Sequence, residues 1–199
     1  MTATVTLHHD VVGMISRFSR FVLRIFGWRV VGDPPDLPKF VAIGAPHTSN
    51  WDFPLALLTA RVARLKISWI GKAGIFRFPF GGLMRWLGGI PVHRTGREGL
   101  VGTMAERFAE ADRLVLAIAP EGTRRAVPYW RSGFYHIAHG AGVPILPVAI
   151  DAVGKEVRFG HVVMPTGRVR EDMDRLRAFF DGVQGVKPAG QGPVRLEEE

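Results

Sequence analysis

The amino-acid sequence predicts an α/β fold: a single domain with a mostly parallel sheet flanked by helices, and an amphipathic helix at the N-terminus. Short apolar runs of strand length alternate with segments whose apolar residues recur every three or four positions, which is the pattern of a parallel sheet covered on both faces. The 199 residues, 47% of them hydrophobic, suffice for one core. No internal repeat or interdomain linker interrupts this pattern.

We expect three parts along the chain. Residues 1–30 form the amphipathic helix, which is a candidate for contact with a membrane surface, and residues 31–185 form the α/β domain. Residues 186–199 are rich in Gly and Pro and then acidic, so a loose C-terminal tail is predicted there.

The N-terminal helix carries Arg17, Arg20 and Arg24, whose spacing of three and four places them on one side. The other side gathers apolar residues, namely Val11, Ile15, Phe18, Val22, Ile25 and Phe26. The arginines leave no uncharged run near the roughly 18 residues that a spanning helix needs, and no small-residue cleavage pattern follows. Two interpretations remain open: a helix at the membrane interface, with Trp28 at its end, or a helix packed on its own domain.

The remaining elements follow in order. Strands are predicted at residues 39–45, 66–70, 90–93, 113–119, 143–151 and 156–164, and helices at 52–65, 82–87, 98–112, 131–140 and 170–183. The runs KFVAIGA, RLVLAIA and VPILPVAID are continuously apolar, as strands buried on both faces are. The helix at 98–112 has Val101, Met104 and Phe108 at helical spacing, and the last helix has Met173 and Leu176 on one face.

Composition restricts the chemistry. The absence of cysteine excludes disulfides, thiolate metal sites and a cysteine nucleophile. The net charge of +8 favours an anionic partner, which leaves nucleic acid, a phosphorylated substrate or an acidic membrane surface. No basic-aromatic recognition motif stands out, so nucleic acid is not expected as a partner.

The stretch APHTSNWDFP follows the first long strand and separates His47 from Asp52 by five positions. On a regular helix that spacing turns two side chains about 140° apart, so the pair needs a bend. If Ser49 or Asn50 caps the following helix, Asp52 falls in the first turn and His47 folds back toward it. The carboxylate then fixes the imidazole tautomer and leaves one ring nitrogen as a base. The alternative is a polar loop with an ordinary helix cap.

Two further polar segments follow strands. APEGTRR brings Glu121, Gly122, Thr123 and Arg124 to the end of the run RLVLAIA, and GGIPVHR ends with Arg94. Guanidinium groups form forked hydrogen bonds with phosphate, and Gly122 permits close backbone approach. Each segment alone is equally compatible with a solvated turn. Because polar clusters at successive strand ends can meet in one crevice, the set favours a single site.

These segments resemble the lysophospholipid acyltransferase superfamily, typified by bacterial 1-acylglycerol-3-phosphate acyltransferases. HTSNWD resembles its H-x4-D motif, and GGIPVHR, PEGTRR and VPILPV resemble its second, third and fourth blocks in the same order. KAGIFRFPFGG and WRSGFYHIAHGAG are similar to family connectors. The chain departs from the family pattern at His93, where an acidic or polar residue is common.

The resemblance implies transfer of a fatty acyl group from an acyl thioester, acyl-coenzyme A or acyl carrier protein, to the hydroxyl of a lysophospholipid-like acceptor such as 1-acylglycerol-3-phosphate. It makes His47 the general base and Asp52 the residue that orients it. The positions that match acceptor binding are Arg94, Glu121, Gly122, Thr123 and Arg124; Lys72 either adds positive charge or is simply solvated.

No bound cofactor and no metal are required by this chemistry, and His136 and His139 lack an evident third ligand. The partners expected are an anionic membrane surface, a lysolipid acceptor and, as one donor, acyl carrier protein. The expected location is peripheral, on the cytoplasmic, inner face of the cell membrane. Two rival functions remain: a thioesterase or hydrolase that uses His47 and Asp52 to activate water, and a noncatalytic protein that binds anionic lipid.

Overall fold

The computed structural model describes residues 2–92 and 97–199. Within these residues, seven strands form one sheet in the order β1-β7-β6-β2-β5-β3-β4. All neighbouring strands run parallel except β6 and β7, so the predicted mostly parallel sheet is confirmed. The strands are β1 (Arg29–Val31), β2 (Lys39–Ala45), β3 (Ile67–Lys72), β4 (Gly89–Val92), β5 (Leu114–Ile118), β6 (Ile145–Asp151) and β7 (Glu156–Phe159).

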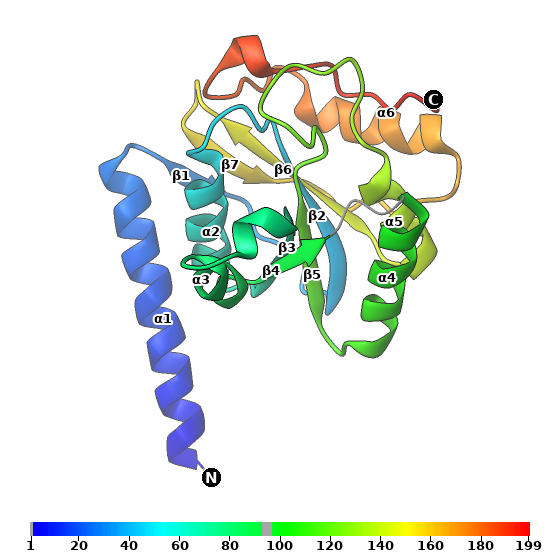
Figure 1. Ribbon diagram of the computed structural model, residues 1–199. Coiled ribbons are helices and arrows are strands. Elements are labelled where there is room, and N and C mark those ends of the chain that lie inside the picture. Colours follow the sequence, from blue (N-terminus) through cyan, green and yellow to red (C-terminus); the bar gives the residue numbers. More distant parts are fainter. Residues whose placement is uncertain (1, 93–96) are drawn as a thin grey trace.

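Helices cover both faces of the sheet, as the sequence predicts. Figure 1 shows α1 and α2 on one side and α4, α5 and α6 on the other. The helices are α1 (Thr2–Ile25), α2 (Asp52–Val62), α3 (Gly81–Trp86), α4 (Arg97–Glu110), α5 (Gly133–Ala141) and α6 (Val169–Phe180), with short 3-10 turns η1 (Ala73–Phe76) and η2 (Pro188–Gly190).

The central strand β2 is buried on both faces. Phe40 and Ala42 pack with apolar residues of β5 and β6 on one face, while Val41, Ile43 and Ala45 join the main core beneath α4, α5 and α6. A strand covered on both sides needs no polar alternation, which explains the uninterrupted apolar run of its sequence. This burial fixes the position at which β2 ends and the polar loop begins.

Several boundaries differ from those that the sequence predicts, among them strand β1 and the ends of α2 and β7. Strand β1 is absent from the predicted set because its three residues are too short to give a periodic signal. Helix α2 ends at Val62 instead of residue 65, since Arg64 adopts a left-handed backbone conformation with φ of 55°. The strand predicted at 156–164 ends at Phe159, and only Val163 pairs again, with Ile145.

Helix α1 packs on α2 through a different face from the apolar one that the sequence predicts. From residue 12 onward, where the side chains of α1 are described, the buried residues are Ser16, Ser19 and Leu23, and the hydroxyl of Ser16 donates a hydrogen bond to the carbonyl of Val62 at 3.0 Å. Small serines let the two helix backbones approach closely, while Phe18, on the apolar face, is left 65% exposed. Figure 1 shows the N-terminal end of α1 extending past the body of the domain.

In the described part of the chain, we find no helix with both the length and the apolar character that crossing a membrane requires.

The C-terminal residues are packed rather than loose, in contrast to the expectation from their composition. The backbone N–H of Trp130 donates to the carbonyl of Arg195 at 2.8 Å, and Leu196 is 2% exposed. The guanidinium of Arg177 also pairs with the carboxylate of Glu199. Glycines permit this packing, because a Cβ on Gly192 would lie 2.2 Å from the carbonyl oxygen of Val127. The segment therefore runs over the loop that follows β5.

Candidate active site

The carboxyl ends of β2, β5, β3 and β4 lie along one edge of the sheet. Strand β2 pairs with β5 so that Ile43 is opposite Ile118, and β5 pairs with β3 so that Ala117 is opposite Trp69. The loop after β2, the loop after β5 and the end of β3 are therefore level with one another. This parallel register is what brings segments from distant parts of the sequence to one place.

The loop after β2 bends so that His47 meets Asp52. The Nδ1 atom of His47 lies 3.1 Å from Oδ2 of Asp52. The same carboxylate oxygen accepts hydrogen bonds from the backbone N–H groups of Thr48 and Ser49, each at 2.7 Å. Asp52 is 2% exposed, so the carboxylate is held from three directions inside the protein. The bend that the five-residue spacing requires is thus formed by the carboxylate itself.

The helix start differs from the predicted cap. Trp51, rather than Ser49 or Asn50, occupies the capping position of α2, and it makes no side-chain cap. The hydroxyl of Ser49 instead accepts the N–H of Trp51 at 3.2 Å. Asp52, in the first helical turn, directs its carboxylate backward into the loop. The helix terminus therefore serves to hold the histidine loop.

The contact with Asp52 determines how the imidazole can act. An ionised carboxylate only accepts hydrogen bonds, so the proton in this contact belongs to Nδ1 of His47. The other nitrogen, Nε2, then carries a lone pair. The side chain of His47 is 24% exposed, so a reactant can reach the ring from solvent. The arrangement provides an oriented base at the molecular surface.

Glu121 holds the histidine from the other side. Its Oε1 atom accepts the backbone N–H of His47 at 2.9 Å, and the residue is 3% exposed. Burial raises the pKa of the Glu121 carboxyl above its ordinary value, against the lowering effect of the His47 N–H. The resemblance implies that Glu121 takes part in acceptor binding. A carboxyl so deeply enclosed instead favours a role in positioning the loop.

Among the described residues, Gly122, Thr123, Arg124 and Lys72 lie on the same edge of the sheet, and none of them forms a hydrogen bond with His47. Gly122 has φ of 65° and donates its N–H to the carbonyl of Ala119 at 3.1 Å, which closes the turn after β5. Thr123 is half-buried and Arg124 is exposed on this loop. Lys72 is exposed at the end of β3, two strand spacings or about 10 Å from β2.

Within the described residues, neither Arg124 nor Lys72 forms a side-chain hydrogen bond or ion pair, so both charges are available to an anion. Arg94, the other arginine predicted to face phosphate, lies outside the described residues, as does His93. Strand β4 ends at Val92, opposite Lys72 on the same edge of the sheet.

One part of the site escapes sequence reasoning: the segment at residues 183–192. The hydroxyl of Thr48 accepts the backbone N–H of Lys187 at 3.0 Å, although the two residues are 139 positions apart. A Cβ on Gly185 would lie 2.7 Å from that hydroxyl oxygen, and one on Gly190 would lie 2.7 Å from the carbonyl of Arg124. The glycines are the only sequence signal of this close approach.

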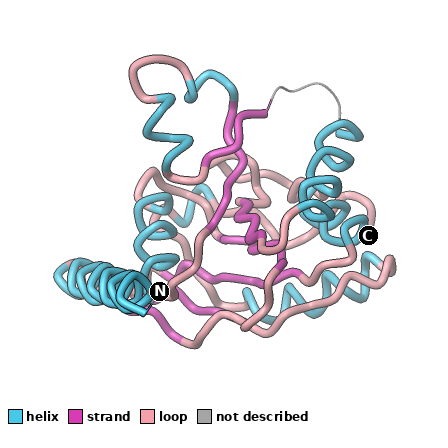
Figure 2. The backbone as a smooth tube through the Cα atoms, turned by 90° about the horizontal axis from the view of Figure 1, so that it is seen from below, coloured by secondary structure: helices cyan, strands magenta, loops and turns pink. Residues whose placement is uncertain are grey.

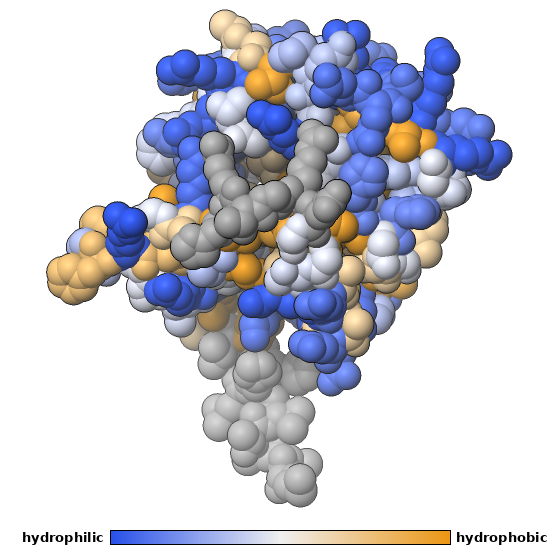
Figure 3. Space-filling view, turned by 45° about the vertical axis from the view of Figure 1, so that its right-hand side comes forward, coloured by the Kyte–Doolittle hydropathy of each residue, from blue (hydrophilic) through white to orange (hydrophobic). Residues whose placement is uncertain are grey.

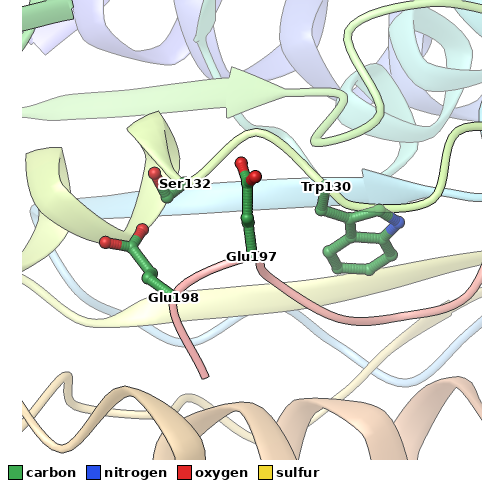
Figure 4. Close-up of a pocket in the computed structure, with 4 residues that line it drawn as sticks. All are labelled: Trp130, Ser132, Glu197 and Glu198. Atoms are coloured by element: carbon green, nitrogen blue, oxygen red, sulfur yellow. The ribbon is translucent and has the colours of Figure 1, made fainter.

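A cavity of about 240 Å³ lies elsewhere, lined by Trp130, Ser132, Glu197 and Glu198 (Figure 4). None of these residues belongs to the predicted site, and two carboxylates make the cavity unsuitable for a phosphate. The histidines of α5 are engaged separately, since His136 lies 3.1 Å from a Glu198 carboxylate oxygen and His139 stacks on Tyr135. In the described ranges, no three His, Asp or Glu side chains gather as a metal site would need.

The chain matches one family model and is similar to enzymes from two bacteria. The family model described as Acyltransferase matches residues 37–151, which include His47, Asp52 and Glu121. The chain is 29% identical over 156 residues to the 1-acyl-sn-glycerol-3-phosphate acyltransferase of Haemophilus influenzae, covering 73% of this chain and 63% of the relative. It is 29% identical over 124 residues to the enzyme of the same name from Escherichia coli, covering 59% and 49%. The chain thus spans about half to two thirds of the length of these relatives.

The fold has a counterpart among solved structures. The 1-acyl-sn-glycerophosphate acyltransferase PlsC from Thermotoga maritima superposes with a TM-score of 0.54 at 20% sequence identity, covering 88% of this chain and 78% of that chain. This similarity concerns the fold. The family model, however, covers more than half of the chain and includes the residues that meet at the ends of β2 and β5. The protein therefore belongs to the acyltransferase family.

Proposed function

We propose that the protein transfers a fatty acyl group from a thioester, of coenzyme A or of acyl carrier protein, to the free hydroxyl of a lysophospholipid, with 1-acylglycerol-3-phosphate as the leading acceptor. The relatives from H. influenzae and E. coli carry the name of that activity. The observation that carries the proposal is the contact of His47 Nδ1 with the buried carboxylate of Asp52, which leaves Nε2 free as a base.

In this mechanism, Nε2 of His47 takes the proton of the acceptor hydroxyl while the hydroxyl oxygen attacks the carbonyl carbon of the thioester. The carbon–sulfur bond then breaks, and the imidazolium of His47 gives its proton to the departing thiolate. The carboxylate of Asp52 stabilises the imidazolium while it keeps its hydrogen bonds from the backbone N–H groups of Thr48 and Ser49. A base of this kind contributes roughly 10²–10⁴-fold to the rate.

Acceptor recognition uses the cations along the same edge of the sheet. Arg124 and Lys72 are exposed beside the loops that hold His47, and Arg94 follows β4 in the sequence. Guanidinium groups bind a phosphate monoester through paired hydrogen bonds. Thr123 lies on the same loop as Arg124. In this proposal, Glu121 and Gly122 maintain the conformation of this loop, and the cations bind the phosphate.

Helix α1 provides the contact with the membrane in this proposal. Its unpacked side exposes Met14, Phe18, Phe21 and Ile25, and Arg17, Arg20 and Arg24 form the adjacent exposed stripe. Apolar and arginine stripes side by side suit the lipid interface, where each arginine near anionic headgroups contributes about 1 kcal/mol. The site would then work peripherally at the anionic inner face of the cell membrane.

The chemistry is tested with the full chain, acyl-coenzyme A or acyl carrier protein thioester, and a panel of lysolipids, with products followed by mass spectrometry. We expect His47→Ala to lower the turnover number roughly 10²–10⁴-fold. The matched control is His161→Ala, because His161 is exposed and lies after β7, away from the site. Equal product from wild type and His47→Ala would remove the assigned base.

A reaction without acceptor separates acyl transfer from hydrolysis. The proposal requires the thioester to persist until a lysolipid is added. Rapid His47-dependent release of free fatty acid in the absence of acceptor, unchanged by adding lysolipid, would identify a thioesterase instead.

The membrane contact is tested by the charge reversal of Arg17, Arg20 and Arg24 to glutamate. We expect loss of binding to vesicles that contain phosphatidylglycerol, because three attractions become repulsions. The control makes the same change in net charge at Arg168, Arg170 and Arg175, which are exposed on and just before α6. Equal vesicle binding by the two variants would contradict a role for α1.

A further inference from the structure

The connection between β3 and β4 exposes a cluster of large apolar side chains. Phe78 is 97% exposed, Trp86 72% and Phe80 65%, and Ile75 and Leu83 are about half exposed. We call residues 75–86 the aromatic projection. Single exposed apolar residues are ordinary on protein surfaces, but a contiguous apolar group is typical of an interaction surface. Figure 2 shows this connection standing out from the sheet, and hydrophobic side chains project at the left edge of Figure 3.

The aromatic projection is a folded unit, so its exposed rings are held outward by structure. Phe76 is buried and stacks on Trp69, with ring centroids 5.7 Å apart. Gly81 packs so closely on the carbonyl of Phe76 that a Cβ there would lie 2.0 Å from the oxygen. The N–H of Gly81 also donates to the carbonyl of Arg77 at 2.8 Å. One phenylalanine thus anchors the unit, and two others point into solvent.

The charge around these rings is of one sign. From residue 53 to residue 92 the sequence contains no Asp or Glu, whereas it contains Arg61, Arg64, Lys66, Lys72, Arg77 and Arg85. Arg77 and Arg85 are exposed within the aromatic projection itself. An apolar cluster rimmed by cations matches the headgroup region of an anionic bilayer. It repels a second copy of the same surface, which argues against a dimer through this face.

The aromatic projection begins at the edge of the sheet that carries the site. Lys72 ends β3 on that edge, and η1 follows directly. Phe53, beside Asp52 in the first turn of α2, contacts Trp69 edge-on with centroids 4.8 Å apart, and Trp69 in turn stacks on Phe76. A line of aromatic contacts therefore connects the start of α2 with the base of the projection. Trp51, next to Asp52, is itself 68% exposed.

We propose that the aromatic projection inserts into the interface of an anionic lipid bilayer, as a second membrane contact distinct from α1. Figure 2 shows α1 and the projection on the side of the molecule away from α4. One contact leaves the protein free to rotate on the membrane, whereas two contacts at separate places fix its orientation. Together they hold the edge that carries His47 against the lipid. This inference rests on the proposed peripheral membrane function.

The chain contains no cysteine, so one introduced thiol can be labelled without a background. In the full chain, Phe78→Cys carries an environment-sensitive fluorophore, and Met164→Cys is the matched control, since Met164 is 53% exposed on the connection after β7. With vesicles of phosphatidylcholine and phosphatidylglycerol, we expect emission at position 78 to shift to shorter wavelength and emission at position 164 to stay unchanged. The proposal is overturned if the protein sediments with vesicles but the emission wavelength at position 78 stays unchanged, as it does at position 164.

The energetic test is the double variant Phe78→Ser and Phe80→Ser, which alters only exposed side chains. Withdrawing two aromatic rings from the lipid interface lowers vesicle affinity by about tenfold or more. Met164→Ser is expected to leave affinity unchanged. Equal affinity in both variants contradicts the proposal. So does a shift at position 78 that occurs without vesicles and disappears on dilution, because the surface would then be binding another copy of the chain.

Failure of this inference is distinguishable from failure of the proposed function. The fluorescence shift needs no turnover, so it is expected to persist in a His47→Ala background. The double variant is expected to lose transfer to acceptors in vesicles while keeping transfer to a short-chain acceptor dissolved as monomers. Equal loss of transfer to both acceptors overturns the membrane role of the projection.

Discussion

The backbone N–H of His47 donates a hydrogen bond of 2.9 Å to Oε1 of Glu121, across 74 positions of sequence. The bond joins the loops that follow two adjacent parallel strands, β2 and β5. Asp52 holds the same histidine through its side chain. His47 is therefore fixed at both its backbone and its ring by two buried carboxyl groups from different elements. Each of these contacts leads to a testable expectation.

Asp52→Asn should weaken His47 as a base. The amide oxygen can take the place of Oδ2 and still accept the N–H groups of Thr48, Ser49 and His47 Nδ1, but it carries no negative charge. The imidazolium that forms when Nε2 accepts a proton then lacks the stabilising negative charge beside it. We expect the turnover number to fall roughly 10²–10⁴-fold with little change in KM. Steady-state kinetics check this, with the exposed Asp112→Asn as control. An unchanged turnover number would contradict a role for the charge of Asp52.

Glu121→Gln should change how stability depends on pH. Because burial raises the pKa of the Glu121 carboxyl in the folded protein, the folded state keeps this proton after the unfolded state has lost it. The contribution of this carboxyl to the free energy of unfolding is fully present below its ordinary pKa of 4.5, and it is lost as the pH rises through the pKa of the folded state. The free energy of unfolding of wild type minus that of Glu121→Gln should therefore fall with rising pH in this window. Urea unfolding at a series of pH values measures it, and parallel profiles would speak against a raised pKa.

Thr48→Val should loosen the C-terminal segment. The substitution keeps the shape of the side chain but removes the acceptor for the N–H of Lys187. We expect a loss of about 1 kcal/mol in the free energy of unfolding, together with faster amide hydrogen exchange at Lys187. Thr103→Val is the control, because that hydroxyl bonds only to Gly99 within α4. The idea fails if exchange at Lys187 is the same in both variants.

Gly122→Ala and Gly102→Ala should have opposite effects on stability. Gly122 adopts φ of 65°, where an alanine is strained by roughly 1–2 kcal/mol, and its turn carries Glu121. Gly102 lies within α4 with open space at its Cβ position, so alanine there stabilises the helix by roughly 0.5–1 kcal/mol. Thermal unfolding checks both signs. We also expect Gly122→Ala to reduce turnover by displacing Glu121, and full activity in a destabilised variant would argue against that coupling.

Most of the fold is predictable because its elements carry strong local signals. The apolar run of β2 and the helical spacing of α4 and α6 place those elements within a few residues. The pairing of His47 with Asp52 is also local, since five residues separate them and the bend depends on their own loop. Strand β1 escapes prediction because three residues carry no period, and its place depends on pairing with β7.

The sequence by itself determined the alternation of strands and helices, the residue types of the site and the excess of positive charge, because each of these is a property of neighbouring residues. Only the tertiary structure decided that Glu121 holds the backbone of His47, that residues 183–192 lie on Thr48, and that α1 packs through its serines and leaves Phe18 in solvent. The physical reason is that contacts between distant residues depend on strand register and helix packing. Those are set by the burial of the whole core rather than by any local pattern.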